Sequence, residues 1–313
     1  MILVTGGTGF VGKALIRSLV ENGWQVRTLV RPSPDSPDLP KGISVEVAVS
    51  SLNDERGLRA AMVGVDTVYH LAGVERRGAY GDLEAVDIQG TRNVISAARD
   101  AGVNRFLTVS HLGADRSSAY PIFKAKAIAE EFIRRSGIDY TILRTAVIFG
   151  PGDGFTTGIA RLLAGIPFAF PVPGDGSTLL QPLWVEDLAT CLTWALDEDD
   201  TRNLTIELGG PEYLTLQQII ELAMEATGDH RRILPVRPPY LRWMTVTLEP
   251  IFPGLPVSVY WLDYLATNRT CTLDTIPRVF NLMPSRMSSQ IEYLKHENWR
   301  ALFWGGLRRP RRK

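Results

Sequence analysis

The 313-residue sequence lacks the features that assign a chain to a class at once. It has two cysteines, Cys191 and Cys271, too few for a disulfide framework or a thiolate metal cluster. Its four histidines are scattered, without the spacing of a zinc site. No apolar run approaches the ~18 residues that a membrane span needs. Only Ile2, Leu3 and Val4 separate the initial methionine from Thr5 and the first glycine, too few for a secretory signal. We therefore expect a cytoplasmic protein.

The sequence also lacks an excess of charge of either sign. Lys+Arg and Asp+Glu both number 34, and five of the basic residues lie in the last six positions, 308–313. The other 29 leave the rest of the chain with a net charge of −5. A slightly acidic body argues against a nucleic-acid partner, since such folds carry a basic face.

Short apolar runs alternate with helical patterns along the first half of the chain. Strands are expected at 2–4, 26–30, 44–49, 67–71, 106–110 and 139–148, and helices at 86–101 and 120–136. This alternation predicts an α/β fold with a parallel sheet that helices cover on both faces. We expect a nucleotide-binding domain at 1–150, its sheet completed by 181–209, where 204–208 forms a strand. Residues 151–180 and 210–313 are expected to form a smaller lobe.

The pattern Gly6-x-x-Gly9-x-x-Gly12 lies directly between the first strand and the first helix. Glycine suits a turn with positive φ, close approach of the backbone to a pyrophosphate, and tight packing of helix on strand. The helix N-terminus then presents free N–H groups to the phosphates. The turn therefore predicts a dinucleotide site rather than only a turn.

Arg31 follows the second strand, where NAD-binding domains usually place an acid. No acidic residue follows until Asp35. An arginine at this position accommodates a 2′-phosphate, which favours NADP(H) over NAD(H). The alternative is an arginine that is only solvated.

Several longer segments resemble one known family. They are TGGTGFVG at 5–12, HLAG at 70–73, GTRNVISAARDAGVNRFLTVS at 90–110, YTILRTAVIFGPGD at 140–153, QPLWVEDLA at 181–189 and ELGGPEYLTLQQI at 207–219. Together they resemble the atypical, extended short-chain dehydrogenases/reductases, which are similar to NAD-dependent epimerases and dehydratases. Within these, the chain is most similar to the group that contains the nucleotide-binding accessory subunit of mitochondrial complex I. The resemblance implies a Rossmann-type, seven-stranded parallel sheet with a small C-terminal lobe.

The resemblance also implies a set of cofactor-binding residues. Those expected to lie against the cofactor, from pyrophosphate through adenine ribose to nicotinamide, are Gly6, Thr8, Gly9, Phe10, Val11, Gly12, Leu71, Ala72, Gly73, Ala146, Val147 and Ile148.

The resemblance implies one catalytic scheme, in which a tyrosine transfers the proton. A lysine four residues later lowers the pKa of the tyrosine phenol and binds the cofactor ribose. Tyr120-x-x-x-Lys124 has this spacing. The family pattern continues Lys-x-x-x-Glu, however, and Lys126 with Glu130 fits that continuation, which puts Ile122 at the tyrosine position. A shift of two residues turns a helix by ~200°, so the two registers exclude each other. We favour Lys126.

Two polar residues at the end of the fifth predicted strand could each have either a functional or a structural role. Ser110, at the position of the family serine, either donates to a substrate carbonyl or caps the strand end. His111 is of a type that moves protons near neutral pH, although a lone loop histidine is more often structural.

The C-terminal region holds an aromatic group that we expect in the core of the lobe: Trp243, Tyr260, Trp261 and Tyr264. Closer to the end, Trp299, Leu302, Phe303 and Leu307 precede the five basic residues. This stretch suits peripheral contact with an anionic membrane or a larger assembly, or else it is a solvated tail.

Three functions fit these patterns. The first is an NADP(H)-dependent oxidoreductase that acts on a small carbonyl compound. The second is a catalytically inactive accessory subunit of a complex I-type assembly, and the third is a nucleotide (redox) sensor. The fold does not separate them.

Overall fold

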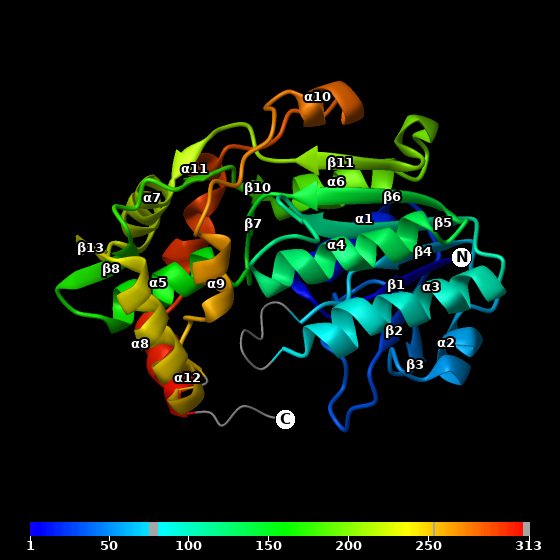
Figure 1. Cartoon of the computed structure of the whole chain (residues 1–313), viewed down its shortest axis with the longest axis horizontal. Coiled ribbons are helices and arrows are strands. Elements are labelled where there is room, and N and C mark those ends of the chain that lie inside the picture. The colour runs from blue at the N-terminus through cyan, green and yellow to red at the C-terminus, as the bar shows by residue number, and fades with distance from the viewer. Residues whose placement is uncertain (75–80, 253, 309–313) are drawn as a thin grey trace.

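A computed structural model describes residues 1–74, 81–252 and 254–308 (Figure 1). Within them the central feature is a seven-stranded sheet whose strand order is β11-β6-β5-β4-β1-β2-β3, with every neighbouring pair parallel. Its strands are β1 (Ile2–Thr5), β2 (Val26–Val30), β3 (Glu46–Val49), β4 (Thr67–His70), β5 (Arg105–His111), β6 (Asp139–Thr145) and β11 (Leu204–Leu208). The predicted Rossmann-type parallel sheet is confirmed, and residues 204–208 are its edge strand.

Helices cover both faces of the sheet. Successive residues of a strand point to opposite faces, and here both faces are apolar. Ile2 and Val4 pack in a core with α1 (Phe10–Glu21) and α6 (Val185–Trp194). Leu3 between them packs in a second core with α2 (Glu55–Ala61), α3 (Thr91–Asp100) and α4 (Pro121–Arg134). This period of two with both faces apolar is typical of a buried parallel sheet.

Two predicted elements end elsewhere than expected. The apolar run 139–148 is not one strand: β6 ends at Thr145, and Ile148 with Phe149 forms β7, which pairs with β10 (Leu183–Trp184). The helix predicted at 86–101 begins as a π-helix, η2 (Glu84–Gly90), and continues as α3. Both departures bring side chains to the carboxyl edge of the sheet.

A smaller lobe lies at the carboxyl ends of the strands, toward which the arrowheads of β6 and β11 point (Figure 1). Its elements are α5 (Thr156–Gly165), β8 (Ala169–Pro173), β9 (Leu179–Leu180), β12 (Leu214–Thr215), α7 (Leu216–Thr227), β13 (Arg232–Val236), α8 (Pro238–Ile251), α9 (Val259–Tyr264), α11 (Met287–Gln290), η4 (Ile291–His296) and α12 (Trp299–Arg308). One segment that the sequence assigned to the lobe, α10 (Thr275–Phe280), instead buries Ile276 and Phe280 in the core shared with α6 and β11.

The aromatic residues of the lobe divide between its core and its surface. Tyr260 and Tyr264 are buried, but Trp243 on α8 is 70% exposed, so the expectation of a core position is wrong for Trp243. Trp299 and Phe303 are buried, and Phe303 packs on Gly165 of α5. These two side chains therefore do not form part of an exposed docking surface.

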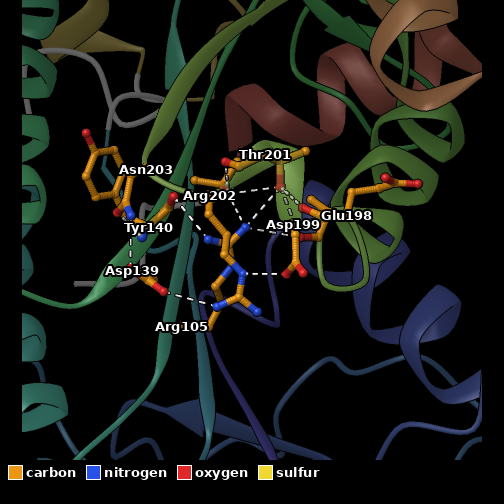
Figure 2. Close-up of polar contacts among 10 residues, drawn as sticks. Arg105, Asp139, Tyr140, Glu198, Asp199, Thr201, Arg202 and Asn203 are labelled. Atoms are coloured by element: carbon orange, nitrogen blue, oxygen red, sulfur yellow. Dashed lines mark hydrogen bonds and ion pairs between the residues drawn. The ribbon is translucent and has the colours of Figure 1, made fainter.

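The amino-terminal ends of β5, β6 and β11 are joined by a polar cluster around the buried Arg105 (Figure 2). One guanidinium nitrogen donates to the hydroxyls of Thr141 at 2.7 Å and Thr201 at 2.9 Å. Thr201 lies in η3 (Asp199–Thr201), directly before β11. At the surface, Arg202 pairs with Asp139 at 3.0 Å. The cluster thus fixes the edge strand at the end of the sheet away from the lobe.

Candidate functional site

A cavity of about 280 Å³ lies at the carboxyl edge of the sheet and extends to the lobe. The residues predicted to bind a cofactor or to act in catalysis that line it are Gly6, Gly9, Phe10, Val11, Gly12, Leu71, Ala72, Gly73, Ser110, Lys126, Ala146, Val147 and Ile148. Four predicted residues are not among its walls: Thr8, Arg31, Tyr120 and Lys124. The fold thus gathers most of the predicted set from segments far apart in the sequence.

Glycine is needed at the three positions of the turn for different reasons. Gly6 has φ +76°, and a Cβ there would stand 2.6 Å from the carbonyl carbon of Leu71. A Cβ on Gly12 would collide with the carbonyl oxygen of Gly6. Gly9 has an ordinary φ of −77°, and the nearest atom to a Cβ there is the Gly6 oxygen at 3.1 Å. Packing within the protein requires the first two, whereas the space beside Gly9 is the cavity itself.

The N-terminus of α1 opens on this cavity. Gly9 is the residue before the helix, and Phe10 and Val11 form its first turn. The N–H groups at a helix N-terminus and the positive end of the helix dipole favour an anion such as a pyrophosphate. The turn therefore fits a dinucleotide, since it combines an anion site with room for a phosphate beside Gly9.

A buried hydrogen-bond chain through His70, the last residue of β4, forms part of the cavity wall. Its Nδ1 lies 2.7 Å from the hydroxyl of Thr5, and its Nε2 lies 2.9 Å from that of Thr91. Thr91 donates its own hydroxyl hydrogen to the carbonyl of Asp87, so Nε2 donates to Thr91 and Nδ1 accepts from Thr5. Burial, with the nearby Lys126 charge, lowers the pKa of His70 to about 3. The ring is neutral at physiological pH.

Lys126 and Asp87 form an ion pair in the cavity wall, with Nζ 2.8 Å from Oδ1. The other oxygen of Asp87 accepts from the backbone N–H of Val74 at 3.2 Å. The π-helix η2 presents Asp87, and its side chain is almost completely buried. This carboxylate therefore holds the ammonium group at a defined point of the cavity.

The competing register places its residues elsewhere on α4. Lys124 is exposed, and Tyr120, directly before the helix, is partly buried with its ring against Phe123. Ile122, at the tyrosine position of the favoured register, lies in the core shared with the lobe. A shift of two residues along the helix thus separates a cavity lysine from a solvent lysine.

Glu130 lines the cavity four residues beyond Lys126 and is held by two arginines. Arg144 binds it through two hydrogen bonds, at 3.0 and 2.7 Å, and Arg134 donates at 2.6 Å. Burial raises the pKa of the carboxyl group, but the hydrogen bonds from Arg144, aided by Ser110 and Arg134, lower it overall. Glu130 is therefore an anion that joins α4 to β6.

Ser110 is buried at the carboxyl end of β5 and lines the cavity. Its hydroxyl lies near enough to Glu130 to affect the pKa of that residue, yet no well-aligned hydrogen bond joins it to any residue that the structure describes. The hydroxyl therefore lies in the cavity wall beside the Glu130 carboxylate.

The far wall of the cavity comes from α9 of the lobe, through Tyr260, Trp261 and Tyr264. Tyr264 packs edge to face on His111 with ring centres 5.9 Å apart. Its hydroxyl is buried and has no hydrogen-bond partner among the described residues. Burial raises the pKa of Tyr264, so the phenol keeps its proton. The sequence indicates these three residues only as members of an aromatic cluster, not as part of the site.

Arg269 supports this wall from behind. Its guanidinium lies over the ring of Phe123, 3.9 Å from the ring centre, and also donates to the carbonyl of Tyr264 at 3.3 Å. A cation on an aromatic face is stabilised by the ring quadrupole. Arg269 thus joins α9 to α4.

Arg31 lies directly after β2 and is exposed, outside the residues that line the cavity. Across the described ranges no three potential ligands gather into a metal site. In the same ranges, no helix has the length and apolar character to span a bilayer.

Comparison with known proteins gives the class of this site. Residues 6–165 match the sequence model of a family described as NAD(P)H-binding. The chain therefore belongs to this NAD(P)H-binding family.

Its curated relatives include enzymes and subunits of assemblies. It is 34% identical to the ceramide reductase of Caulobacter vibrioides over 61% of this chain, and spans only 59% of that protein. It is 30% identical to sterol demethylase protein B of Methylococcus capsulatus, over 80% of this chain and 81% of the relative. It is 28% identical to the mitochondrial NADH dehydrogenase (ubiquinone) 1 alpha subcomplex subunit 9 of Arabidopsis thaliana, over 86% and 70%.

Solved structures share the fold. The triphenylmethane reductase of Citrobacter superposes with a TM-score of 0.76 at 23% identity, covering 94% of this chain and 98% of that one. An NADPH-dependent quinone oxidoreductase from Escherichia coli, solved with NADPH, has a TM-score of 0.74 at 20% identity, with 94% and 99% covered.

Proposed function

We propose that this protein reduces a carbonyl compound with NADPH. The observation that carries the proposal is the cavity, which joins the glycine turn of the first domain to the aromatic residues of α9. Cofactor bound at the turn and substrate bound against the lobe would share one enclosed space. The ceramide reductase among the relatives supports reduction as the reaction type.

Reduction requires a hydride and a proton, and NADPH would supply the hydride to the carbonyl carbon. We assign the proton to the phenol of Tyr264. In the favoured register the usual proton donor, a tyrosine, is replaced by Ile122, which cannot transfer a proton. As the C=O double bond becomes a C–O single bond, the phenol transfers its proton to the oxygen and is reprotonated from water. Ser110 would donate a hydrogen bond to the same oxygen.

Lys126 would bind the nicotinamide ribose, positioned by Asp87. Replacing Lys126 with Ala removes a charge-assisted hydrogen bond of about 1.5–3 kcal/mol, so the Kd for NADPH should rise about tenfold or more. Lys124→Ala, two residues away and exposed, is the matched control and should bind NADPH normally. Equal losses in both variants would contradict this assignment.

Arg31 would select NADP(H) over NAD(H) by pairing with the 2′-phosphate. Its position after β2 supports this, because that strand end lies beside the adenosine in Rossmann-type domains. Arg31→Ala should weaken NADPH binding and leave NADH binding unchanged in fluorescence titrations. A loss of equal size for both nucleotides would show that Arg31 does not read the phosphate.

Turnover is tested by NADPH oxidation with a panel of aldehydes and ketones. Tyr264→Phe should reduce kcat at least tenfold while the Kd for NADPH stays the same. If no carbonyl compound is reduced, the chain is a nucleotide sensor where NADPH exchanges freely, and an accessory subunit where NADPH copurifies without exchange. Ile122 in place of a catalytic tyrosine, and relatives named as a complex I subunit and photosystem II assembly factors, favour this second function.

We also propose that the protein works in the cytoplasm, at the surface of a membrane or assembly. The support is the exposed apolar face of α8, with Tyr240 at 61% and Trp243 at 70%, together with Trp304 of α12 at 50%. The end of α8 meets α12 where Gly254 packs on Gly306. The basic residues 309–313 follow α12 and lie outside the described residues.

A further inference from the structure

A second cavity, of about 180 Å³, lies in the lobe beneath α8, enclosed by α5, α7, β8 and α9. We propose that it binds the aliphatic tail of the substrate while the carbonyl group of that substrate lies at the nicotinamide. The inference rests on the proposed reductase activity for the position of the carbonyl, but not for the binding of the tail.

The lining of this cavity sets the chemistry of its ligand. The described residues that line it carry no charged side chain, and their polar side-chain groups are the hydroxyls of Thr245 and Ser258 and the indole N–H of Trp261. Such a surface offers no recognition for a sugar, a nucleotide or an anion. It gains free energy by burying methylene groups, at about 0.8 kcal/mol each.

The size of the cavity indicates that it holds part of a molecule. Pockets for whole small ligands measure roughly 300–1,000 Å³. A space of about 180 Å³ is smaller than this range and suits a flexible chain. The cavity therefore suits the chain of a ligand whose polar part lies in a neighbouring space.

The neighbouring space is the cofactor cavity, and the two cavities meet at a shared aromatic residue. Trp261 lines both cavities. Its ring centre lies 5.0 Å from that of Phe155, which lines the apolar cavity, and 4.9 Å from that of Tyr260, which lines the cofactor cavity. A tail bound beneath α8 would therefore place its polar head beyond Trp261, beside the proposed proton donor Tyr264.

The outer wall of the apolar cavity offers a route of entry. Met244 of α8 lines the cavity and is also 39% exposed, and Trp243 next to it is 70% exposed. An apolar chain can thus follow apolar surface from solvent to the interior.

Gly158 of α5 gives a direct test, because a Cβ there meets only Pro256, at 3.7 Å or more. In Gly158→Leu the leucine side chain fills part of the cavity. Leucine has a higher helix propensity than glycine, so the variant should fold. Gly305→Leu in α12 is the matched control, since a Cβ there has no atom within 4 Å.

The probes are n-hexanol, n-octanol and n-decanol, titrated calorimetrically without nucleotide. In the unmodified protein the Kd should fall about fourfold per methylene group, which corresponds to about 0.8 kcal/mol. Gly158→Leu should weaken n-decanol binding at least tenfold, whereas Gly305→Leu should not change it. The tail site would be overturned if the affinity for the alcohols did not depend on chain length. It would also be overturned if the Gly158→Leu variant bound n-decanol as tightly as the unmodified protein.

Turnover then tests the link between the two cavities. With n-butanal and n-decanal as substrates, the longer aldehyde should have the lower KM, and Gly158→Leu should remove the difference without changing NADPH affinity. Length-dependent alcohol binding without any turnover would overturn the reductase proposal and leave the tail site standing. If the aldehydes are reduced with a KM that does not depend on chain length, the proposal that tail and carbonyl group belong to one bound substrate is overturned.

Discussion

At the scale of single residues, His70 makes the stability of the protein depend on pH. Its pKa is about 3 in the folded chain, against about 6.5 when unfolded. Below pH 6.5 the unfolded chain binds a proton that the folded chain does not, so stability falls as the pH decreases from 6.5 toward 3. Between pH 7.5 and 5.5 the free energy of unfolding should decrease by about 1.4 kcal/mol through this residue.

Urea denaturation at the two pH values measures this loss. His70→Gln keeps polar groups between Thr5 and Thr91 but does not titrate, so its stability should change less between pH 7.5 and 5.5. His296→Gln, an exposed histidine near the C-terminus, should retain the full pH dependence. An unchanged slope in His70→Gln would show that other groups cause the effect.

The glycine turn gives a second prediction at this scale, because Gly6 and Gly9 are required for different reasons. Valine can adopt the φ of −77° at Gly9, and a Cβ there is crowded only by the Gly6 oxygen at 3.1 Å, so Gly9→Val should lower the melting temperature less than Gly6→Val. The valine side chain of Gly9→Val would occupy the place of the pyrophosphate and abolish NADPH binding. Gly6→Val, with φ +76° and the Leu71 backbone 2.6 Å away, should lower the melting temperature as well. Micromolar NADPH affinity in Gly9→Val would refute the placement of the phosphates.

At the scale of elements, Arg105 holds β11 to the sheet. Arg105→Leu removes charge-assisted hydrogen bonds to Thr141 and Thr201 and leaves their region buried. We expect a loss of about 3 kcal/mol in the free energy of unfolding. Arg202→Ala, which breaks only surface ion pairs of the same cluster, should leave the denaturation midpoint almost unchanged. Equal effects would mean that the buried bonds add nothing beyond the surface pairs.

The sheet elements could be predicted because a parallel strand buried on both faces is a continuous apolar run between turn residues. The same rule fails at 139–148, where two buried strands of different sheets adjoin and hydrophobicity does not mark the break after Thr145. The glycine turn is local in sequence and was therefore visible. The wall of α9 was not, because Tyr264 reaches His111 only through tertiary packing. The pairing of Asp87 with Lys126 was not visible either, because it depends on the π-helix.

At the scale of the whole molecule, the polar cluster and the site lie at opposite ends of the same strands. Arg105 begins β5, and Ser110 and His111 end it. The lobe closes over the carboxyl edge, where the core around Phe123 and Ile122 of α4 continues into Tyr260 and Tyr264. Because this core is shared, movement of the lobe relative to the sheet would change the cofactor cavity and its aromatic wall together.

The last prediction concerns the basic tail, whose charge contrasts with the acidic body. Each basic residue close to an anionic bilayer contributes roughly 1 kcal/mol, and aromatic side chains lie at the headgroup boundary. The available aromatic surface is that of Trp304 and α8, because Trp299 and Phe303 are buried. Deleting residues 308–313 should abolish salt-sensitive binding to anionic vesicles in a flotation assay. NADPH affinity and melting temperature should not change, since the glycine turn belongs to the other domain. Trp243→Ser should weaken vesicle binding without removing its salt dependence. If the full chain does not bind such vesicles at low ionic strength, the tail has no role in membrane contact.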